Sequence, residues 1–282
     1  MKTYRIMVCP GIGDFSWLWS KLSTTEDRFI IEYADTGPER LGAFLNLLPT
    51  EKIERFSQNK KYRVQFNTSL LTMNIIPDMP KMQSYSQIQS LPGVTWFVEA
   101  NTPVEQGIRL ENWMPNIKTD HHYKINGLLT NYRPQNIFIV HLSSFKMEKI
   151  WKTYNADQWI PMIDMIQRKT GWMPIFIGGS YDDAAQACFE RYIENHRAVN
   201  LIGRTDDLKS VLCLIQQSKL FLGCVSSGMT MLANVLNVPS VSFWPREKLA
   251  QSWPDTNIPY LWFLWKDWTK DMSIIEEWIK NI

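Results

Sequence analysis

The sequence predicts an α/β fold made of two domains, each built around a parallel β-sheet. Three observations support this prediction. The length of 282 residues suits two domains of ordinary size. The hydrophobic share of 45% is ample for packed cores. In the second half of the chain, short β-rich apolar runs alternate with segments of helical period, which is typical of parallel sheets with helices packed on them.

The second half of the chain shows this alternation most clearly. We expect five strands there, at residues 137–142, 174–177, 199–202, 219–222 and 240–244. Between them we expect four helices, at residues 157–169, 182–195, 206–217 and 228–236. Right-handed connections would then bring all five strands into one parallel sheet.

The first half begins in the same way and then becomes harder to interpret. We expect strands at residues 4–8 and 29–33, with a glycine turn and a helix from Asp14 between them. Candidate strands at 63–66 and 95–98 are separated by proline-containing loops, so the order of these elements stays open.

The domain boundary is expected in the polar segment 112–135, which lacks a clean period. The sequence therefore predicts an amino-terminal domain over residues 1–125 and a carboxy-terminal domain over residues 136–264. The Trp-rich tail is expected to end in a helix from about Ser273, and we expect the segment at about 265–282 to return to the amino-terminal domain.

Charge and composition exclude several classes of protein. The net charge of +2 is too small to indicate a polyanionic partner. The four cysteines lie far apart and form no Cys-x-x-Cys pair, which favours reduced thiols over a disulfide framework or a zinc site. The apolar stretch 6–9 is too short for a signal-peptide core, and no apolar run approaches the roughly 20 residues of a spanning helix. We expect a cytoplasmic monomer, with peripheral membrane contact left open.

A glycine turn follows the first expected strand, in the sequence Cys-Pro-Gly-Ile-Gly-Asp at residues 9–14. Gly11 and Gly13 would turn the chain and leave Asp14 at a helix start. A carboxylate there can simply cap the helix, because its oxygens accept from unpaired backbone N–H groups. It can also deprotonate an acceptor hydroxyl, because ligands of open α/β sheets bind at the carboxyl edge. The sequence lacks both a complete dinucleotide fingerprint and a P-loop.

Small and hydroxylated residues fill the turn before the expected helix 228–236, in the sequence Gly-Cys-Val-Ser-Ser-Gly-Met-Thr. Backbone N–H groups at a helix N-terminus attract phosphate, glycine lets phosphate approach the main chain, and serine hydroxyls add donors. An ordinary serine cap would explain the same sequence. The candidate phosphate-binding residues are Ser226, Ser227, Gly228 and Thr230.

Two further strand-to-helix turns would lie on the same edge of the sheet. One contains Gly178 and Gly179, and the other contains Gly203, Thr205 and Asp206. Each turn alone is an ordinary helix start. Together with the turn at 223–230 they would line one carboxyl edge, where a nucleotide could extend from a base pocket to a pyrophosphate site.

Taken in order, these segments resemble glycosyltransferase family 9, the ADP-heptose:lipopolysaccharide heptosyltransferases and their relatives. The resemblance covers about residues 137–245 and the first twenty residues. It implies the GT-B architecture, in which two Rossmann-like domains with parallel sheets face each other across a cleft. It also implies that the amino-terminal domain takes the acceptor and the carboxy-terminal domain holds a nucleotide-diphosphate sugar.

The resemblance further implies an inverting transfer that needs no metal and no cofactor besides the donor substrate. Asp14 matches the family's proposed catalytic base, and Gly11 and Gly13 would lie on the acceptor side. A basic residue in the loop after the strand 137–142 would assist the departing diphosphate. The three candidates are Lys146, Lys149 and Lys152, of which we choose Lys149.

The sequence leaves the sugar and the acceptor open. Many relatives have an acidic residue and a histidine where this chain has Ser226 and Met231, so the sugar is not fixed. We expect the acceptor to be a glycan or glycolipid. The alternatives are a protein, a small molecule or a modified nucleic-acid base, because a basic run extends from Lys52 to Arg63. A non-catalytic nucleotide-sugar-binding protein and a sugar-nucleotide epimerase of similar architecture are also consistent with the sequence.

Overall fold

The computed structural model divides the chain into two compact units, Met1–Asn116 and Ile117–Ile282. Their boundary lies within the segment that was expected to be the linker. The structure describes residues 3–8, 12–13, 16, 28–34, 40–48, 53–58, 62–67, 72–77, 127, 129, 136–142, 156–180, 182–194, 197–205, 207–224, 228–244, 258–264 and 268–282.

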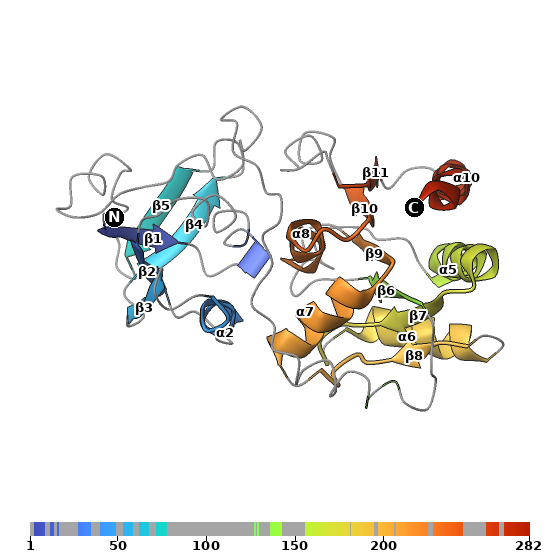
Figure 1. The fold of residues 1–282 in the computed structure, drawn as a ribbon, viewed down its shortest axis with the longest axis horizontal. Helices are drawn as coiled ribbons and strands as arrows, with labels where there is room; N and C mark the ends of the chain where they lie inside the picture. Colours follow the sequence, from blue (N-terminus) through green and yellow to red (C-terminus); the bar gives the residue numbers. More distant parts are fainter. Residues whose placement is uncertain are drawn as a thin grey trace. The chain divides into compact units, whose positions relative to one another are not determined.

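Unit 1 contains a three-stranded parallel sheet in the order β1-β2-β3 (Figure 1). The strands are β1 (Thr3–Val8), β2 (Arg28–Ala34) and β3 (Ile53–Gln58). The first two confirm the expected strands. Strand β3 was not expected, because its sequence Ile-Glu-Arg-Phe-Ser-Gln mixes charged and apolar residues without a clean alternation. Helix α2 (Arg40–Leu45) connects β2 to β3 and buries Phe44.

An antiparallel two-stranded ribbon follows in unit 1. It pairs β4 (Tyr62–Asn67) with β5 (Thr72–Pro77). Strand β4 contains the candidate strand at 63–66, which is thereby confirmed. The other candidate, at 95–98, lies outside the described residues.

Unit 2 contains a six-stranded, fully parallel sheet in the order β11-β10-β9-β6-β7-β8. Its strands are β6 (Ile137–His141), β7 (Met173–Phe176), β8 (Val199–Asn200), β9 (Leu220–Cys224), β10 (Ser240–Trp244) and β11 (Tyr260–Leu264). The five expected strands are confirmed. The sixth, β11, lies at the sheet edge and was missed because its aromatic run shows no alternation; all its residues are half-buried except Phe263, which is buried.

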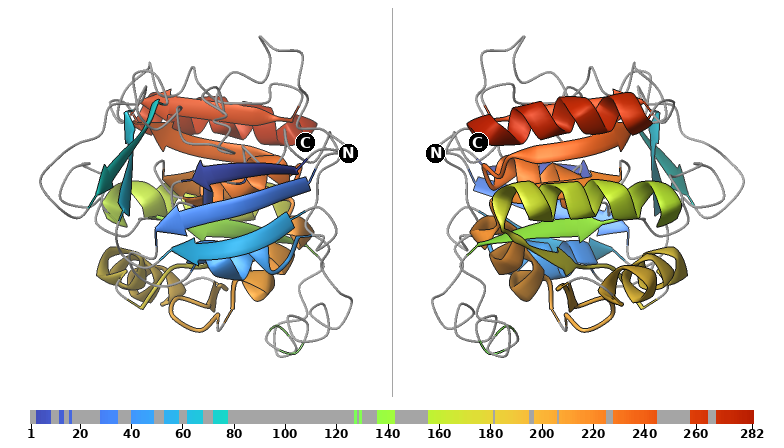
Figure 2. Two further views of the ribbon diagram at one scale, coloured as in Figure 1. Left: turned by 90° about the vertical axis from the view of Figure 1, so that its left-hand side faces the viewer. Right: turned by 90° about the vertical axis from the view of Figure 1, so that its right-hand side faces the viewer.

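Helices cover both faces of this sheet (Figures 1 and 2). One face is covered by α5 (Ala156–Thr170), α6 (Asp183–Ile193) and α10 (Trp268–Trp278). The other carries α7 (Leu208–Gln217) and α8 (Gly228–Val235). The four helices expected between the strands are confirmed, with bounds shifted by one or two residues. None of the helices in the described part of the chain is both long and apolar enough to cross a bilayer.

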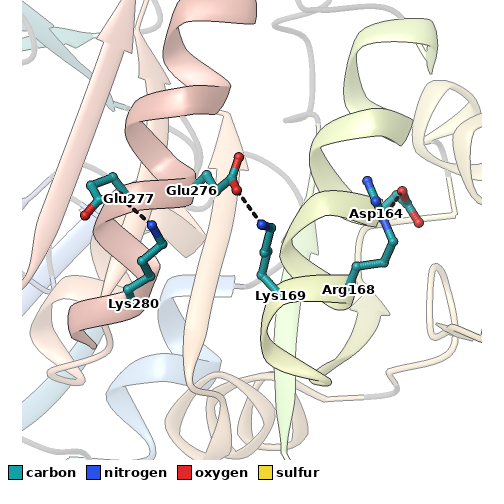
Figure 3. Close-up of polar contacts among 6 residues, drawn as sticks. All are labelled: Asp164, Arg168, Lys169, Glu276, Glu277 and Lys280. Carbon is teal, nitrogen blue, oxygen red and sulfur yellow. Dashed lines mark hydrogen bonds and ion pairs between the residues drawn. The ribbon is translucent and has the colours of Figure 1, made fainter.

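Helix α10 differs from its expected placement. It begins at Trp268, five residues earlier than expected, and it packs on α5 within unit 2, whereas a return to the amino-terminal domain was expected. Ile275 and Ile279 are buried in the same core cluster as α5, and Lys169 Nζ lies 2.6 Å from Glu276 Oε1 (Figure 3). An apolar stripe at helical spacing needs a covering partner, and α5 supplies one in the same unit.

Candidate functional site

The strand order of unit 2 places a topological switch point between β6 and β9. From β6 the chain runs through α5 and α6 to β7 and β8 on one side, and from β9 it runs through α8 to β10 on the other. The covering helices lie on opposite faces, so they diverge at this point. In open α/β sheets, ligands bind outside the carboxyl ends of the strands at the switch point. In this chain that position lies beyond His141 of β6 and Cys224 of β9.

The carboxyl end of β9 and the start of α8 lie at this switch point. Helix α8 starts at Gly228, the first described residue after β9, so its free N–H groups lie at the carboxyl edge. Thr230, predicted to bind the donor, is only 1% exposed. Its Oγ1 atom lies 3.2 Å from the position of a Cβ on Gly223, so Thr230 lies against strand β9. Ser226 and Ser227 lie outside the described residues.

The turns after β7 and β8 are joined to each other at the same edge. The N–H of Gly203 donates to the carbonyl of Gly178 over 2.9 Å. Gly203 has a φ of +66°, and a Cβ there would lie 3.1 Å from Cα of Ser180. Both the backbone conformation and the close approach therefore require glycine at this position. Gly178 and Gly179 are half-buried and precede α6.

Two aspartates cap the helices that follow these turns. Asp182, 2% exposed, accepts through Oδ1 from the N–H of Ala185 at the start of α6. Asp207 accepts from the N–H of Ser210 over 2.7 Å and caps α7. The helix expected from Asp206 therefore begins after Asp207. Asp206 lies outside the described residues, and Thr205 is half-buried just before it.

The sequence analysis missed two side chains near these turns. Asn200 accepts from the N–H of Ile202 over 2.9 Å and donates to Gln186 Oε1 over 2.8 Å, which fixes the end of β8. His141 ends β6 and is 7% exposed, in register with Gly223 of β9. A histidine that closes an apolar strand is a weak signal, and only the strand order shows that it lies at the switch point.

The described part of the amino-terminal turn is compact. Ile12, Gly13 and Ser16 are buried, and Ser16 Oγ donates to the carbonyl of Gly13 over 2.6 Å. Gly11 and Asp14 lie outside the described residues, as do the three lysines at 146, 149 and 152. Their assigned roles stay predictions.

Metal-ligating side chains do not gather in the described part of the chain. No three of His, Cys, Asp and Glu come together there as metal ligands would. Whether the reaction needs a metal therefore stays a prediction.

The sequence of residues 99–251, more than half of the chain, matches the family described as "Glycosyltransferase family 9 (heptosyltransferase)". A search of curated proteins found no match.

Three solved structures share the fold over nearly the whole chain. The glycosyl transferase family 9 protein from Veillonella parvula is 13% identical with a TM-score of 0.65, over 100% of this chain and 90% of that one. The E. coli ADP-heptose lps heptosyltransferase II is 11% identical with a TM-score of 0.64, over 99% and 98%. The E. coli heptosyltransferase WaaC with ADP is 10% identical with a TM-score of 0.56, over 100% and 99%.

These likenesses define the class of the protein. It is a nucleotide-sugar glycosyltransferase with the GT-B fold, built from two Rossmann-like domains. The chain belongs to glycosyltransferase family 9, the heptosyltransferase family. The family resemblance deduced from the sequence motifs is thereby confirmed.

Proposed function

We propose that the protein transfers a sugar from a nucleotide-diphosphate sugar to a hydroxyl of a glycan or glycolipid, in the manner of a heptosyltransferase. We further propose that the transfer inverts the anomeric centre and requires no metal. The observation that carries the proposal is the switch point between β6 and β9, where α8 starts beyond the carboxyl end of β9 and next to the end of β6.

The donor diphosphate would bind at the start of α8. Free backbone N–H groups and the positive end of the helix dipole favour an anion there. The preceding turn carries Ser226 and Ser227, whose hydroxyls would add donors. The nucleoside would extend along the same edge toward the joined turns at Gly178 and Gly203, because these follow the neighbouring strands β7 and β8.

The transfer itself would be a single displacement. The carboxylate of Asp14 takes the proton of the acceptor hydroxyl while the acceptor oxygen forms a bond to the anomeric carbon. The bond between that carbon and the diphosphate oxygen breaks at the same time, and the nucleoside diphosphate leaves with the electron pair. Lys149 and the N–H groups of α8 would stabilise the negative charge on the departing diphosphate.

The test is a transfer assay with purified protein and a panel of nucleotide-sugars that includes ADP-heptose. The acceptors are lipopolysaccharide core fragments, with duplex DNA carrying a modified base as the comparison. We expect transfer to the glycan with inverted configuration by NMR, unchanged by EDTA. Asp14→Asn should lower kcat by about a hundredfold to ten-thousandfold, the usual worth of a general base.

Asp157→Asn is the matched control, since Asp157 is an exposed aspartate on α5 that pairs with Arg191. It should leave kcat unchanged. Retained configuration would contradict the inverting mechanism, and loss of activity with EDTA would contradict metal independence. Donor binding without transfer would indicate a binding protein, and release of an isomerised sugar without an acceptor would indicate an epimerase.

A further inference from the structure

Phe221 is the second residue of β9 and is fully buried. Gly223 follows two residues later on the same strand, so both residues face the same side of the sheet. A Cβ on Gly223 would lie 2.5 Å from Cε1 of Phe221 and 3.2 Å from Oγ1 of Thr230 in α8. The Phe221 ring therefore reaches along its own strand, and the ring and the first turn of α8 both close over Gly223.

The same ring also contacts the neighbouring strand. The rings of Phe221 and His141 have centroids 6.2 Å apart with an interplanar angle of 34°. His141 lies in register with Gly223, which makes it the diagonal neighbour of Phe221 across the β6–β9 pair. The Phe221 ring thus occupies the junction of β6, β9 and α8, next to the turn at the switch point.

We propose that Phe221 is a positioning residue for the nucleotide-sugar donor: its ring, held over Gly223 between His141 and Thr230, supports the first turn of α8 and aligns that turn with the diphosphate. This inference rests on the proposed function, because it assumes that the diphosphate binds at the start of α8. It assigns Thr230 a supporting role beside Phe221, since the Thr230 side chain is 1% exposed.

The physical reason lies in the shortness of α8. The helix has eight residues, and in its first turn Thr230 is buried while Gly228, Met229 and Met231 are half-buried, so Thr230 anchors that turn. A binding group that is displaced by about 1 Å can lose a large part of its effect. A rigid ring under that turn limits the displacement, whereas a leucine at position 221 would be too short to cover Gly223.

The central experiment compares Phe221→Leu with Phe243→Leu. Both phenylalanines are fully buried on neighbouring strands, but Phe243 lies on the α5 face and packs edge-on against Trp159 at 5.1 Å. The probe is the nucleoside diphosphate, among ADP, GDP, UDP and CDP, that raises the melting temperature of the unaltered protein most. Its dissociation constant is measured by calorimetry at a temperature where both variants are folded.

We expect Phe221→Leu to raise the dissociation constant about tenfold, and Phe243→Leu to change it by less than about twofold although it also lowers the melting temperature. In steady-state assays Phe221→Leu should raise KM for the donor and leave KM for the acceptor unchanged. Equal dissociation constants for the two variants would overturn the inference. Failure of every nucleoside diphosphate to bind the unaltered protein would overturn the proposed function as well.

A second pair of variants tests the contact over Gly223 directly. Gly223→Ala places a methyl carbon 2.5 Å from Cε1 of Phe221, which forces the ring to move, so it should weaken donor binding about as much as Phe221→Leu does. In the Phe221→Leu background the methyl group no longer meets the phenylalanine ring and keeps only its 3.2 Å approach to Oγ1 of Thr230, so Gly223→Ala should add less than about a twofold further change. Fully additive effects of the two substitutions would contradict the proposed support.

Discussion

The two faces of the six-stranded sheet in unit 2 are both covered by helices, but they differ in the kinds of side chains that they bury. The face under α5, α6 and α10 is apolar and aromatic, with Trp159 edge-on to Phe243 and Phe243 stacked on Phe263. Among the described residues, the side under α7 and α8 contains most of the buried polar residues of the unit. They are His141, Ser210, Ser218, Thr230, Asn234, Ser240 and Ser242.

Because of this difference, the residues that contribute most to stability and the residues near the candidate site lie on different faces of the sheet. Burial of apolar and aromatic area is the main favourable term in folding, and the α5 face buries most of the large aromatic rings, so the largest losses on truncation are expected there. Buried polar groups contribute less and cost free energy when they lack partners. The α8 side carries that cost, and it is the side on which the start of α8, the proposed diphosphate site, lies. Proteins commonly depart from ideal packing near functional sites.

We expect the largest loss of stability from a substitution on the apolar face, under α5, α6 and α10. Trp159→Ala should lower the free energy of unfolding by about 3–5 kcal/mol, because a 2% exposed indole is replaced by a cavity. Chemical denaturation followed by circular dichroism measures the loss. Ser242→Ala on the other face, which removes a 2.8 Å hydrogen bond to Tyr260, should cost only about 1 kcal/mol. Equal losses would remove the distinction between the two faces.

A gain of stability is expected on the polar side. Asn234 is 1% exposed, and its side-chain nitrogen and oxygen find no hydrogen-bond partner among the described residues. Asn234→Leu, of similar shape, should raise the free energy of unfolding by about 1–2 kcal/mol.

Asn200→Leu is the matched control for that gain. It removes the hydrogen bonds to Gln186 and Ile202 and should destabilise the protein. If both leucine variants lose stability to the same extent, burial of the Asn234 amide does not lower the free energy of unfolding as we propose.

The buried thiol of Cys188, on the α5 side of the sheet, makes the free energy of unfolding fall as pH rises in the alkaline range. Burial raises the pKa of its thiol from 9.0 to about 12, with a smaller opposing effect of Arg191. Above about pH 9 the unfolded thiol loses its proton while the folded thiol keeps it, so its contribution to stability is present below pH 9 and falls as pH rises toward 12. The loss should reach about 1 kcal/mol near pH 10. Denaturation curves at pH 8 and pH 10 measure this loss, and Cys188→Ala should flatten the dependence; an unchanged slope would contradict it.

The smallest effect is expected on the exposed surface between α5 and α10. Lys169 lowers the pKa of Glu276, so this ion pair stabilises the fold above the ordinary pKa of the carboxyl group and is lost as pH falls. Both side chains are largely in water, and such pairs contribute little. Glu276→Gln should shift the melting temperature barely measurably, and not at all in high salt. A shift as large as that of Trp159→Ala would show that the ion pair holds α10 in place.

Sequence patterns predicted the fold of unit 2 well because its elements are strongly periodic. Strand β10 was predicted with its observed ends, and α5 and α8 within one residue at each end. Unit 1 was predicted less completely. Strand β3 contains Glu54 and Arg55, whose charges hide its pattern, and the pairing of β4 with β5 depends on contacts that no local pattern encodes.

The placement of α10 shows the same limit. Its apolar stripe is visible in the sequence, but a stripe says only that the helix must be covered and does not say by which element. From the sequence we expected the amino-terminal domain to cover this stripe, whereas in the structure α5 of unit 2 covers it.

By itself, the sequence determined five of the six strands of unit 2 and the four helices between them, the glycine and serine turns and the resemblance to family 9, because periodicity and turn chemistry are local properties. Only the tertiary structure decided which turns lie together. The order β11-β10-β9-β6-β7-β8 places the ends of β6 and β9 side by side although 82 residues separate His141 from Gly223 along the chain. It also placed Phe221, His141 and Thr230 around Gly223, since contacts between distant strands and a helix depend on packing that local sequence does not record.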